Sequence, residues 1–131
     1  MRTDAQSSGD LAESTVAAGL ARRGWTILAR NVRVGRGELD IVAVDPGPPA
    51  MLVIVEVRWR RSRAFGFAEE TLDHRKRAHL RAAIGRLLED GLPGGAALPA
   101  PPMRVDLAVA EPAAGAAGDA RIRHHRAIAL G

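Results

Sequence analysis

The feature that most constrains the fold is a pair of apolar stretches joined by a turn rich in proline and glycine. Residues 38–44 (ELDIVAV) and 51–58 (MLVIVEVR) are dominated by β-branched and apolar side chains, which favour β-strands. Between them, residues 45–50 (DPGPPA) have the composition of a turn. The pattern predicts a β-hairpin. Strands this apolar on both faces are usually covered by helices on each side, although such coverage is more typical of parallel sheets.

The segments around the hairpin predict two helices and further strands. Apolar residues at helical spacing predict a first helix over residues 11–23, ended by Gly24, and a main helix from about residue 72 to residue 90. Extended segments are predicted from Trp25 onward and over residues 104–110, with a last edge strand over residues 122–130. The order α, β, β, β, α, β, β predicts a mixed β-sheet flanked by helices, in the α/β class.

The length of 131 residues and the hydrophobic content of 47% fit one domain. We expect it to cover residues 9–131, after a flexible N-terminus over residues 1–8. The absence of cysteine excludes disulfides and thiolate metal sites. The first ten residues are polar, and no apolar run approaches the roughly 18 residues of a membrane span. These features predict a soluble cytoplasmic protein without membrane partners.

The charge balance predicts an anionic partner. Lysine and arginine number 19 against 15 acids, which gives a net charge of +4 and a pI near 11.1. Arginines that suit phosphate follow the second strand of the hairpin. They are Arg58, Arg60, Arg61 and Arg63. The alternative is a solvated basic face in an arginine-biased composition, which the single lysine of the chain, Lys76, supports.

The hairpin places two acids on one face. If the turn is centred on Pro48, opposite residues have numbers that sum to about 96, so Asp40 lies opposite Glu56. Like charges directly opposite each other destabilise a sheet. A divalent cation such as Mg²⁺ would offset the repulsion and would also bring a water and a phosphate together. The alternative is that Asp40 pairs with an arginine and Glu56 sits exposed at a strand end.

Several strings together carry a family resemblance. Residues 37–42 (GELDIV), residues 53–58 (VIVEVR), Lys76 on a helix and residues 103–107 (MRVDL) resemble the YraN family of predicted endonucleases, from about Gly9 to the C-terminus. That family is similar in turn to archaeal Holliday-junction resolvases. The resemblance implies a restriction-endonuclease-like fold with its PD-(D/E)xK site, and metal-dependent hydrolysis of DNA, including branched or structured DNA.

The resemblance also implies individual roles. Glu13 would be an outlying acid on the first helix, Asp40 the principal ligand of Mg²⁺ or Mn²⁺, and Glu56 the second ligand. The backbone carbonyl of Val57 would be an additional ligand. Arg58 stands where the motif has lysine, and arginine cannot lose its proton to act as a base, although it can hold a phosphate oxygen.

Lys76 matches a lysine on the second helix of the family, so it could take the cationic role that Arg58, which stands in place of the motif lysine, performs poorly. The alternative is that Lys76 is part of a solvated basic face. Trp59, among Arg58, Arg60 and Arg61, could stack on a base, whereas Trp25 is expected in the core. Asp106 is expected to pair with an arginine, with a role in the site as the alternative. None of the four histidines has a convincing ligand spacing.

Two functions therefore remain open from the sequence. The first is a metal-dependent endonuclease acting on DNA. The second is a nucleic-acid-binding protein of the same fold with little or no cleavage activity, for which Arg58 is the motivating residue. A third, weaker hypothesis is a scaffold or interaction module in which the acids have a structural role. A homodimer would bring two active sites to two strands, as in resolvase-like nucleases, but no interface is visible in the sequence.

Overall fold

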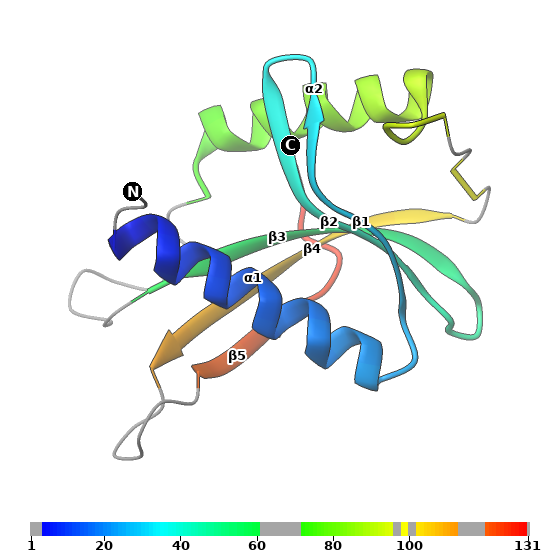
Figure 1. The fold of residues 1–131 in the computed structure, drawn as a ribbon. Coiled ribbons are helices and arrows are strands. Elements are labelled where there is room, and N and C mark those ends of the chain that lie inside the picture. Colours follow the sequence, from blue (N-terminus) through cyan, green and yellow to red (C-terminus); the bar gives the residue numbers. More distant parts are fainter. Residues whose placement is uncertain (1–3, 61–71, 96–97, 100–101, 113–119, 131) are drawn as a thin grey trace.

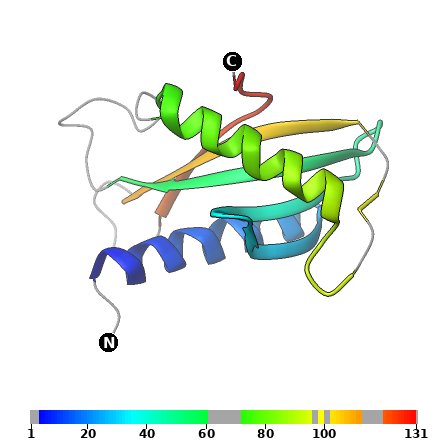
Figure 2. The same ribbon diagram turned by 90° about the horizontal axis from the view of Figure 1, so that it is seen from above.

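The computed structural model describes residues 4–60, 72–95, 98–99, 102–112 and 120–130. Within these residues the chain forms three layers, a five-stranded sheet between two helices (Figures 1 and 2). The strand order is β1-β2-β3-β4-β5, with β3 and β4 parallel and the other neighbours antiparallel. The elements are α1 (Asp4–Arg22), β1 (Thr26–Val34), β2 (Gly37–Asp45), β3 (Met51–Trp59), α2 (His74–Asp90), β4 (Met103–Pro112) and β5 (Ala120–His125).

This architecture confirms the predicted single α/β domain with a mixed sheet flanked by helices, and it is consistent with a restriction-endonuclease-like fold. The flexibility predicted for residues 1–8 stays a prediction; residues 1–3 lie outside the described part. Among the described residues, neither helix has the length and apolarity needed to cross a membrane.

The helices cover opposite faces of the sheet because each has an apolar stripe at helical spacing. Val16, Ala17 and Leu20 of α1 pack with Trp25 against strand residues such as Val53. On the other face, α2 buries its own stripe against β1, β2 and β3. That stripe comprises Leu80, Ala83, Ile84 and Leu87. Trp25 is 6% exposed, which confirms its predicted place in the core.

Polar caps fix where α2 begins and ends. The Asp73 carboxylate accepts a hydrogen bond from the backbone N–H of Lys76 at 2.9 Å, which satisfies a donor in the first turn. Gly91 ends the helix with φ of 76°, a backbone conformation that favours glycine. The first cap places Lys76 at the end of α2 nearest to β3, beside Glu56.

Two predicted boundaries differ widely from the structure. Helix α1 begins at Asp4, seven residues before the predicted start. Strand β5 ends at His125 rather than continuing to residue 130. The chain turns at Ala127, which has φ of 53°, and the Ile128 N–H then donates to the Val105 carbonyl at 2.8 Å. The C-terminal residues therefore pack on the core rather than extending the sheet edge.

The predicted hairpin register is confirmed, and it stops where the acids begin. Val44 pairs with Leu52 and Val42 with Ile54, as the sum of 96 requires, and the last paired residues are Ile41 and Val55. Beyond this point β2 stays paired with β1 as far as the turn at residues 34–37, while β3 stays paired with β4 as far as Trp59. The sheet therefore forks, and the β1–β2 hairpin bends toward α2 (Figure 1).

Candidate active site

The fork of the sheet holds two carboxylates close together. Asp40 accepts a hydrogen bond at Oδ2 from the Val57 N–H at 2.8 Å, so its side chain bridges the strands where the ladder has ended. Glu56 is only 4% exposed. Burial and the neighbouring Asp40 carboxylate raise the pKa of Glu56 to about 7. The like-charge contact expected from the sequence is therefore present, although Asp40 and Glu56 lie beyond the last ladder pair.

Two cations face Glu56 from different elements. The Lys76 ammonium, from α2, lies 3.2 Å from Glu56 Oε1, and the Arg58 guanidinium Nε, from β3, lies 3.9 Å from the same oxygen. The alternative in which Glu56 is exposed at a strand end is wrong, because its side chain is buried. In the described residues Asp40 makes no ion pair with an arginine. Lys76 thus occupies the position beside the second acid.

Glu13 approaches the same fork from α1. It is 6% exposed and accepts a hydrogen bond from Arg30 Nε at 3.1 Å. Burial and the nearby Asp40 and Glu38 charges raise the pKa of Glu13, against the opposing effect of Arg30. We name Glu13, Asp40, Glu56 and Lys76 the fork site. It joins residues that lie on two helices and two strands.

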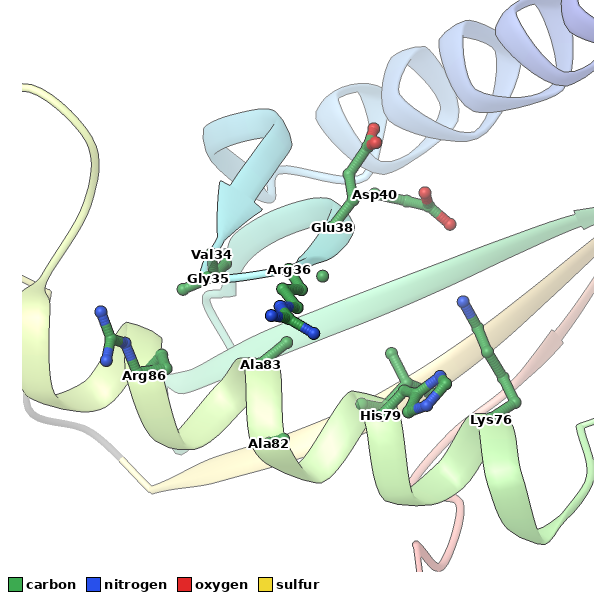
Figure 3. A pocket seen from close by; sticks show the side chains of 12 residues that line it. Val34, Gly35, Arg36, Glu38, Asp40, Lys76, His79, Ala82, Ala83 and Arg86 are labelled. Atoms are coloured by element: carbon green, nitrogen blue, oxygen red, sulfur yellow. The ribbon is translucent and has the colours of Figure 1, made fainter.

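Two cavities meet at Asp40. The smaller cavity, of about 240 Å³, is lined by Glu13, Asp40 and Val57. The family resemblance assigned all three residues to the site. The other, of about 650 Å³, lies between the β1–β2 turn and α2 and includes Asp40 and Lys76 (Figure 3). Glu38 lines both cavities. A ligand bound at Asp40 would therefore be reached from both faces of the sheet.

The donor set of the fork fits a hard divalent cation. Mg²⁺ keeps several waters and needs only one or two carboxylates from the protein, together with substrate phosphate. Asp40 and Glu56 supply two carboxylates, and their mutual repulsion is the interaction that a cation would relieve. Within the described residues, no group of three or more acidic, histidine or cysteine side chains is arranged to hold a metal. Metal binding at Asp40, Glu56 and Val57 stays a prediction.

Three of the predicted nucleic-acid-binding residues lie at the end of β3 or directly after it. Arg58, Trp59 and Arg60 are partly exposed there, and the Arg60 N–H donates to the Ala110 carbonyl at 2.8 Å. The Arg58 Nε and Trp59 Nε1 atoms are buried without a hydrogen-bond partner in the described part of the chain. Arg61 and Arg63 lie outside the described residues. Contacts of all these residues with nucleic acid stay predictions.

Sequence reasoning missed four residues that line the larger cavity: Arg36, Glu38, His79 and Arg86. Arg36 belongs to the β1–β2 turn, whereas His79 and Arg86 belong to α2. A helical spacing of Lys76, His79 and Arg86 on one face of α2 was the available signal. Nothing in the local sequence indicates that the β1–β2 turn approaches that face.

A second group of acids lies near the β2–β3 turn. Arg104 donates to Asp45 Oδ2 at 2.8 Å and to Asp106 Oδ1 at 3.0 Å, and His124 Nε2 lies 2.8 Å from Asp106 Oδ2. We name these four residues the arginine cluster. Burial acts to raise the pKa of Asp106, but its hydrogen bonds with His124, Arg104 and the Ala127 N–H hold that pKa below its ordinary value. The predicted pairing of Asp106 with an arginine is confirmed.

Comparison with known proteins assigns the chain to a family. The model of an uncharacterised protein family, UPF0102, matches residues 12–110. A UPF0102 protein of Roseiflexus castenholzii is 48% identical over 80 residues, which cover 61% of this chain and 62% of that protein. The UPF0102 protein sce2912 of Sorangium cellulosum is 48% identical over 79 residues, which cover 60% of this chain and 53% of that protein.

A third relative, from Desulforamulus reducens, is 41% identical over 88 residues, which cover 67% of this chain and 70% of that protein. The match thus spans less than two thirds of the first two relatives. The aligned family segment, residues 12–110, includes every residue of the fork site and the whole of the fork. The chain therefore belongs to the family UPF0102, the YraN group that its sequence motifs resemble.

Proposed function

We propose that the protein is a metal-dependent endonuclease that hydrolyses phosphodiester bonds in DNA. The observation that carries the proposal is the buried contact between Asp40 and Glu56 at the fork, where the pKa of Glu56 is raised to about 7. A fold that keeps two carboxylates together without matching them fully to arginine favours an external cation. Perturbed acids beside cavities of this size are typical of functional sites.

The chain supplies oxygen ligands for that cation. Asp40 has one carboxylate oxygen held by the Val57 N–H, which fixes the orientation of the side chain and leaves Oδ1 for a metal. Glu56 would be the second ligand and the Val57 carbonyl the third. A bound Mg²⁺ or Mn²⁺ supplies an acidified water as nucleophile and neutralises charge on the phosphoryl oxygens. Glu13 lines the smaller cavity and would orient water there.

Lys76 takes the cationic role at the site. Its ammonium lies 3.2 Å from Glu56, against 3.9 Å for the Arg58 guanidinium, so it is the nearer of the two cations. In that place it favours the ionised form of Glu56 and can hold a non-bridging oxygen of the scissile phosphate. Arg58, partly exposed at the end of β3, is suited to a second phosphate oxygen.

A cleavage assay tests the proposal. Purified protein is incubated with plasmid, single-stranded and four-way-junction DNA in Mg²⁺ or Mn²⁺, beside the variant Asp40→Ala. We expect metal-dependent cleavage by the wild type and a loss of at least about 10³-fold in Asp40→Ala, since a catalytic metal contributes several kcal/mol. Cleavage that survives Asp40→Ala would point to a contaminant or another site.

The second candidate is a nucleic-acid-binding protein with little or no cleavage activity, and Arg58 in the place of the motif lysine favours it. Binding without cleavage on every substrate would support this candidate against the first. Affinity measured at several salt concentrations separates both from a scaffold, because phosphate contacts cause a steep loss of affinity with added salt. A homodimer and a cytoplasmic location are further parts of the proposal, and sedimentation tests the first.

A further inference from the structure

We infer that the larger cavity receives a single-stranded segment of DNA next to the scissile phosphate, so that substrates with unpaired strands are preferred over intact duplex. The inference rests on the proposed function and narrows its substrate class. The cavity of about 650 Å³ lies between the β1–β2 turn and α2 and reaches Asp40 at one end (Figure 3). A strand lying in it would pass directly to the fork site.

The charges along the cavity match a phosphodiester chain. Arg36 projects from the β1–β2 turn, while Lys76 and His79 project from α2 toward the same space (Figure 3). In the described part of the chain, no ion pair or hydrogen bond engages the side chains of Arg36 and His79. Arg86, farther along α2, makes an exposed ion pair with Asp90 at 3.3 Å. Arg36 and His79 are therefore free to bind phosphate. Lys76 already pairs with Glu56, and the carboxylates of Glu38 and Asp40 also line the cavity.

Apolar side chains lie between these cations. Val34, Leu80 and Ala83 line the cavity, and all three belong to the buried core on the α2 side of the sheet. A duplex stacks its bases against one another and presents its phosphates outward, so it offers little to an apolar lining. A single strand exposes its sugars and base faces together with its phosphates, and it uses both kinds of contact.

The dimensions of the cavity favour the same substrate. Clefts of about 300–1,000 Å³ enclose a drug-sized ligand, and the volume of about 650 Å³ falls in that range. The β1–β2 turn packs closely on α2 beside the cavity. A Cβ added at Gly37 would lie 3.2 Å from the Ala83 Cβ. A rigid duplex cannot enter a recess of this kind, whereas a flexible strand can follow it.

Binding to short oligonucleotides tests the inference without cleavage. Fluorescence anisotropy in EDTA compares a labelled single strand with the blunt duplex of the same sequence, at several salt concentrations. We expect the single strand to bind at least about tenfold more tightly, as base contacts add to phosphate contacts. Equal or tighter binding of the blunt duplex would overturn the inference.

Matched variants locate the binding. Arg36→Ala should weaken single-strand binding about three- to tenfold. It should also reduce the slope of log affinity against log salt concentration by about 0.7, the contribution of one phosphate contact. Arg33→Ala is the control, because Arg33 is an exposed arginine of the same hairpin that does not line the cavity. We expect it to stay within about twofold of the wild type. Equal effects of the two variants would contradict the inference.

A second variant tests the cavity without removing a cation. Ala82 is exposed and lines the cavity, so Ala82→Glu adds a negative charge there with little risk to folding. We expect it to weaken single-strand binding at least as much as Arg36→Ala, since like charges repel. Binding unchanged in Ala82→Glu would exclude the cavity as the site.

Cleavage of two substrates separates the failure of this inference from that of the proposed function. A duplex with a single-stranded arm is compared with a blunt duplex in Mn²⁺. Preferential cleavage of the armed duplex, reduced in Arg36→Ala and not in Arg33→Ala, is expected. Equal cleavage of both substrates would overturn the inference and leave the endonuclease proposal standing. Tight single-strand binding through Arg36, with no cleavage of either substrate, would retain the cavity as the strand-binding site and overturn the endonuclease.

Discussion

The two halves of strand β2 lie in different electrostatic environments. At one end Asp45 belongs to the arginine cluster, where Arg104 lies 2.8 Å away and the pKa of Asp45 is held below its ordinary value by hydrogen bonds from the Gly47 N–H and Arg104, despite burial. At the other end Asp40 lies in the fork site, where burial raises the pKa of Glu56 to about 7. The same strand thus carries one acid, Asp45, that pairs with an arginine, and one acid, Asp40, that faces a second carboxylate.

The difference separates a structural use of buried acids from a functional one. In the arginine cluster both carboxylates accept hydrogen bonds from Arg104 and from a backbone N–H, and the pKa values of Asp45 and Asp106 lie below their ordinary values. In the fork site, Lys76 and Arg58 only partly offset two neighbouring carboxylates and the burial of Glu56. Such a site gains from an external cation, which is the basis of the proposed function.

The largest expected effect is on stability, and it lies in the arginine cluster. Asp106 is fully buried and bonds Arg104, His124 and the Ala127 N–H. Asp106→Asn should lower the free energy of unfolding by about 3–5 kcal/mol, because it removes the buried charge that pairs with the half-buried Arg104. Urea denaturation measures the change. The matched variant Asp40→Asn should change it by less than about 1 kcal/mol, because the amide oxygen keeps the Val57 hydrogen bond. Equal losses in both variants would erase the distinction between the two regions.

The next effect is a pH dependence caused by Glu56. Its pKa rises from 4.5 to about 7 on folding, so the folded protein binds the proton more tightly than the unfolded chain. Stability should therefore fall as pH rises from about 4.5 to 7, by about 2–3 kcal/mol in metal-free buffer. Urea denaturation of wild type and Glu56→Gln isolates this contribution, since the variant lacks the titrating group. Parallel profiles of the two proteins across that window would contradict the raised pKa.

A smaller effect concerns Lys76. Lys76→Ala should reduce the rate of cleavage about 10²-fold, the usual loss for one charge-stabilising donor, with little change in stability because the side chain is partly exposed. Initial rates at saturating DNA and Mn²⁺ measure the loss. Lys76→Arg is the control that keeps the charge, and it should retain more activity than Lys76→Ala. Full activity in Lys76→Ala would place this lysine in a solvated basic face.

The smallest effect is expected at Arg58. Its Nε lies 3.9 Å from Glu56, farther than the Lys76 ammonium, so Arg58→Ala should lower the cleavage rate by less than about tenfold. The same assay ranks the two cations. A larger loss of cleavage rate in Arg58→Ala than in Lys76→Ala would reverse the assignment, and Arg58 would then be the main cation of the site.

The sequence predicted the hairpin well because its determinants are local. The turn at residues 45–50 fixes the register, and the apolar alternation fixes which residues share a face. The fork at Asp40 was not predictable from this pattern. It depends on β1, which keeps β2 as its partner beyond Ile41, and on a turn that packs against α2 at Ala83.

The same reasoning explains the residues that were missed. The larger cavity joins Arg36 to His79 and Arg86, which lie on a different element far along the chain. For Asp106, an arginine partner was expected, but its bond to His124 depends on the pairing of β4 with β5. Local patterns therefore identified Asp40 and Glu56, the family resemblance added Glu13, and only the packing of distant elements identified their surroundings.

Calorimetric titration with Mn²⁺ tests the central claim most directly, that the acids of the fork site bind a divalent cation. The wild type should bind one Mn²⁺ per chain, and Asp40→Asn should weaken that binding at least about tenfold, because it removes a charged ligand. Asp45→Asn, on the same strand but in the arginine cluster, should bind Mn²⁺ as the wild type does. Absence of binding to the wild type, or equal binding by Asp40→Asn, would contradict the account.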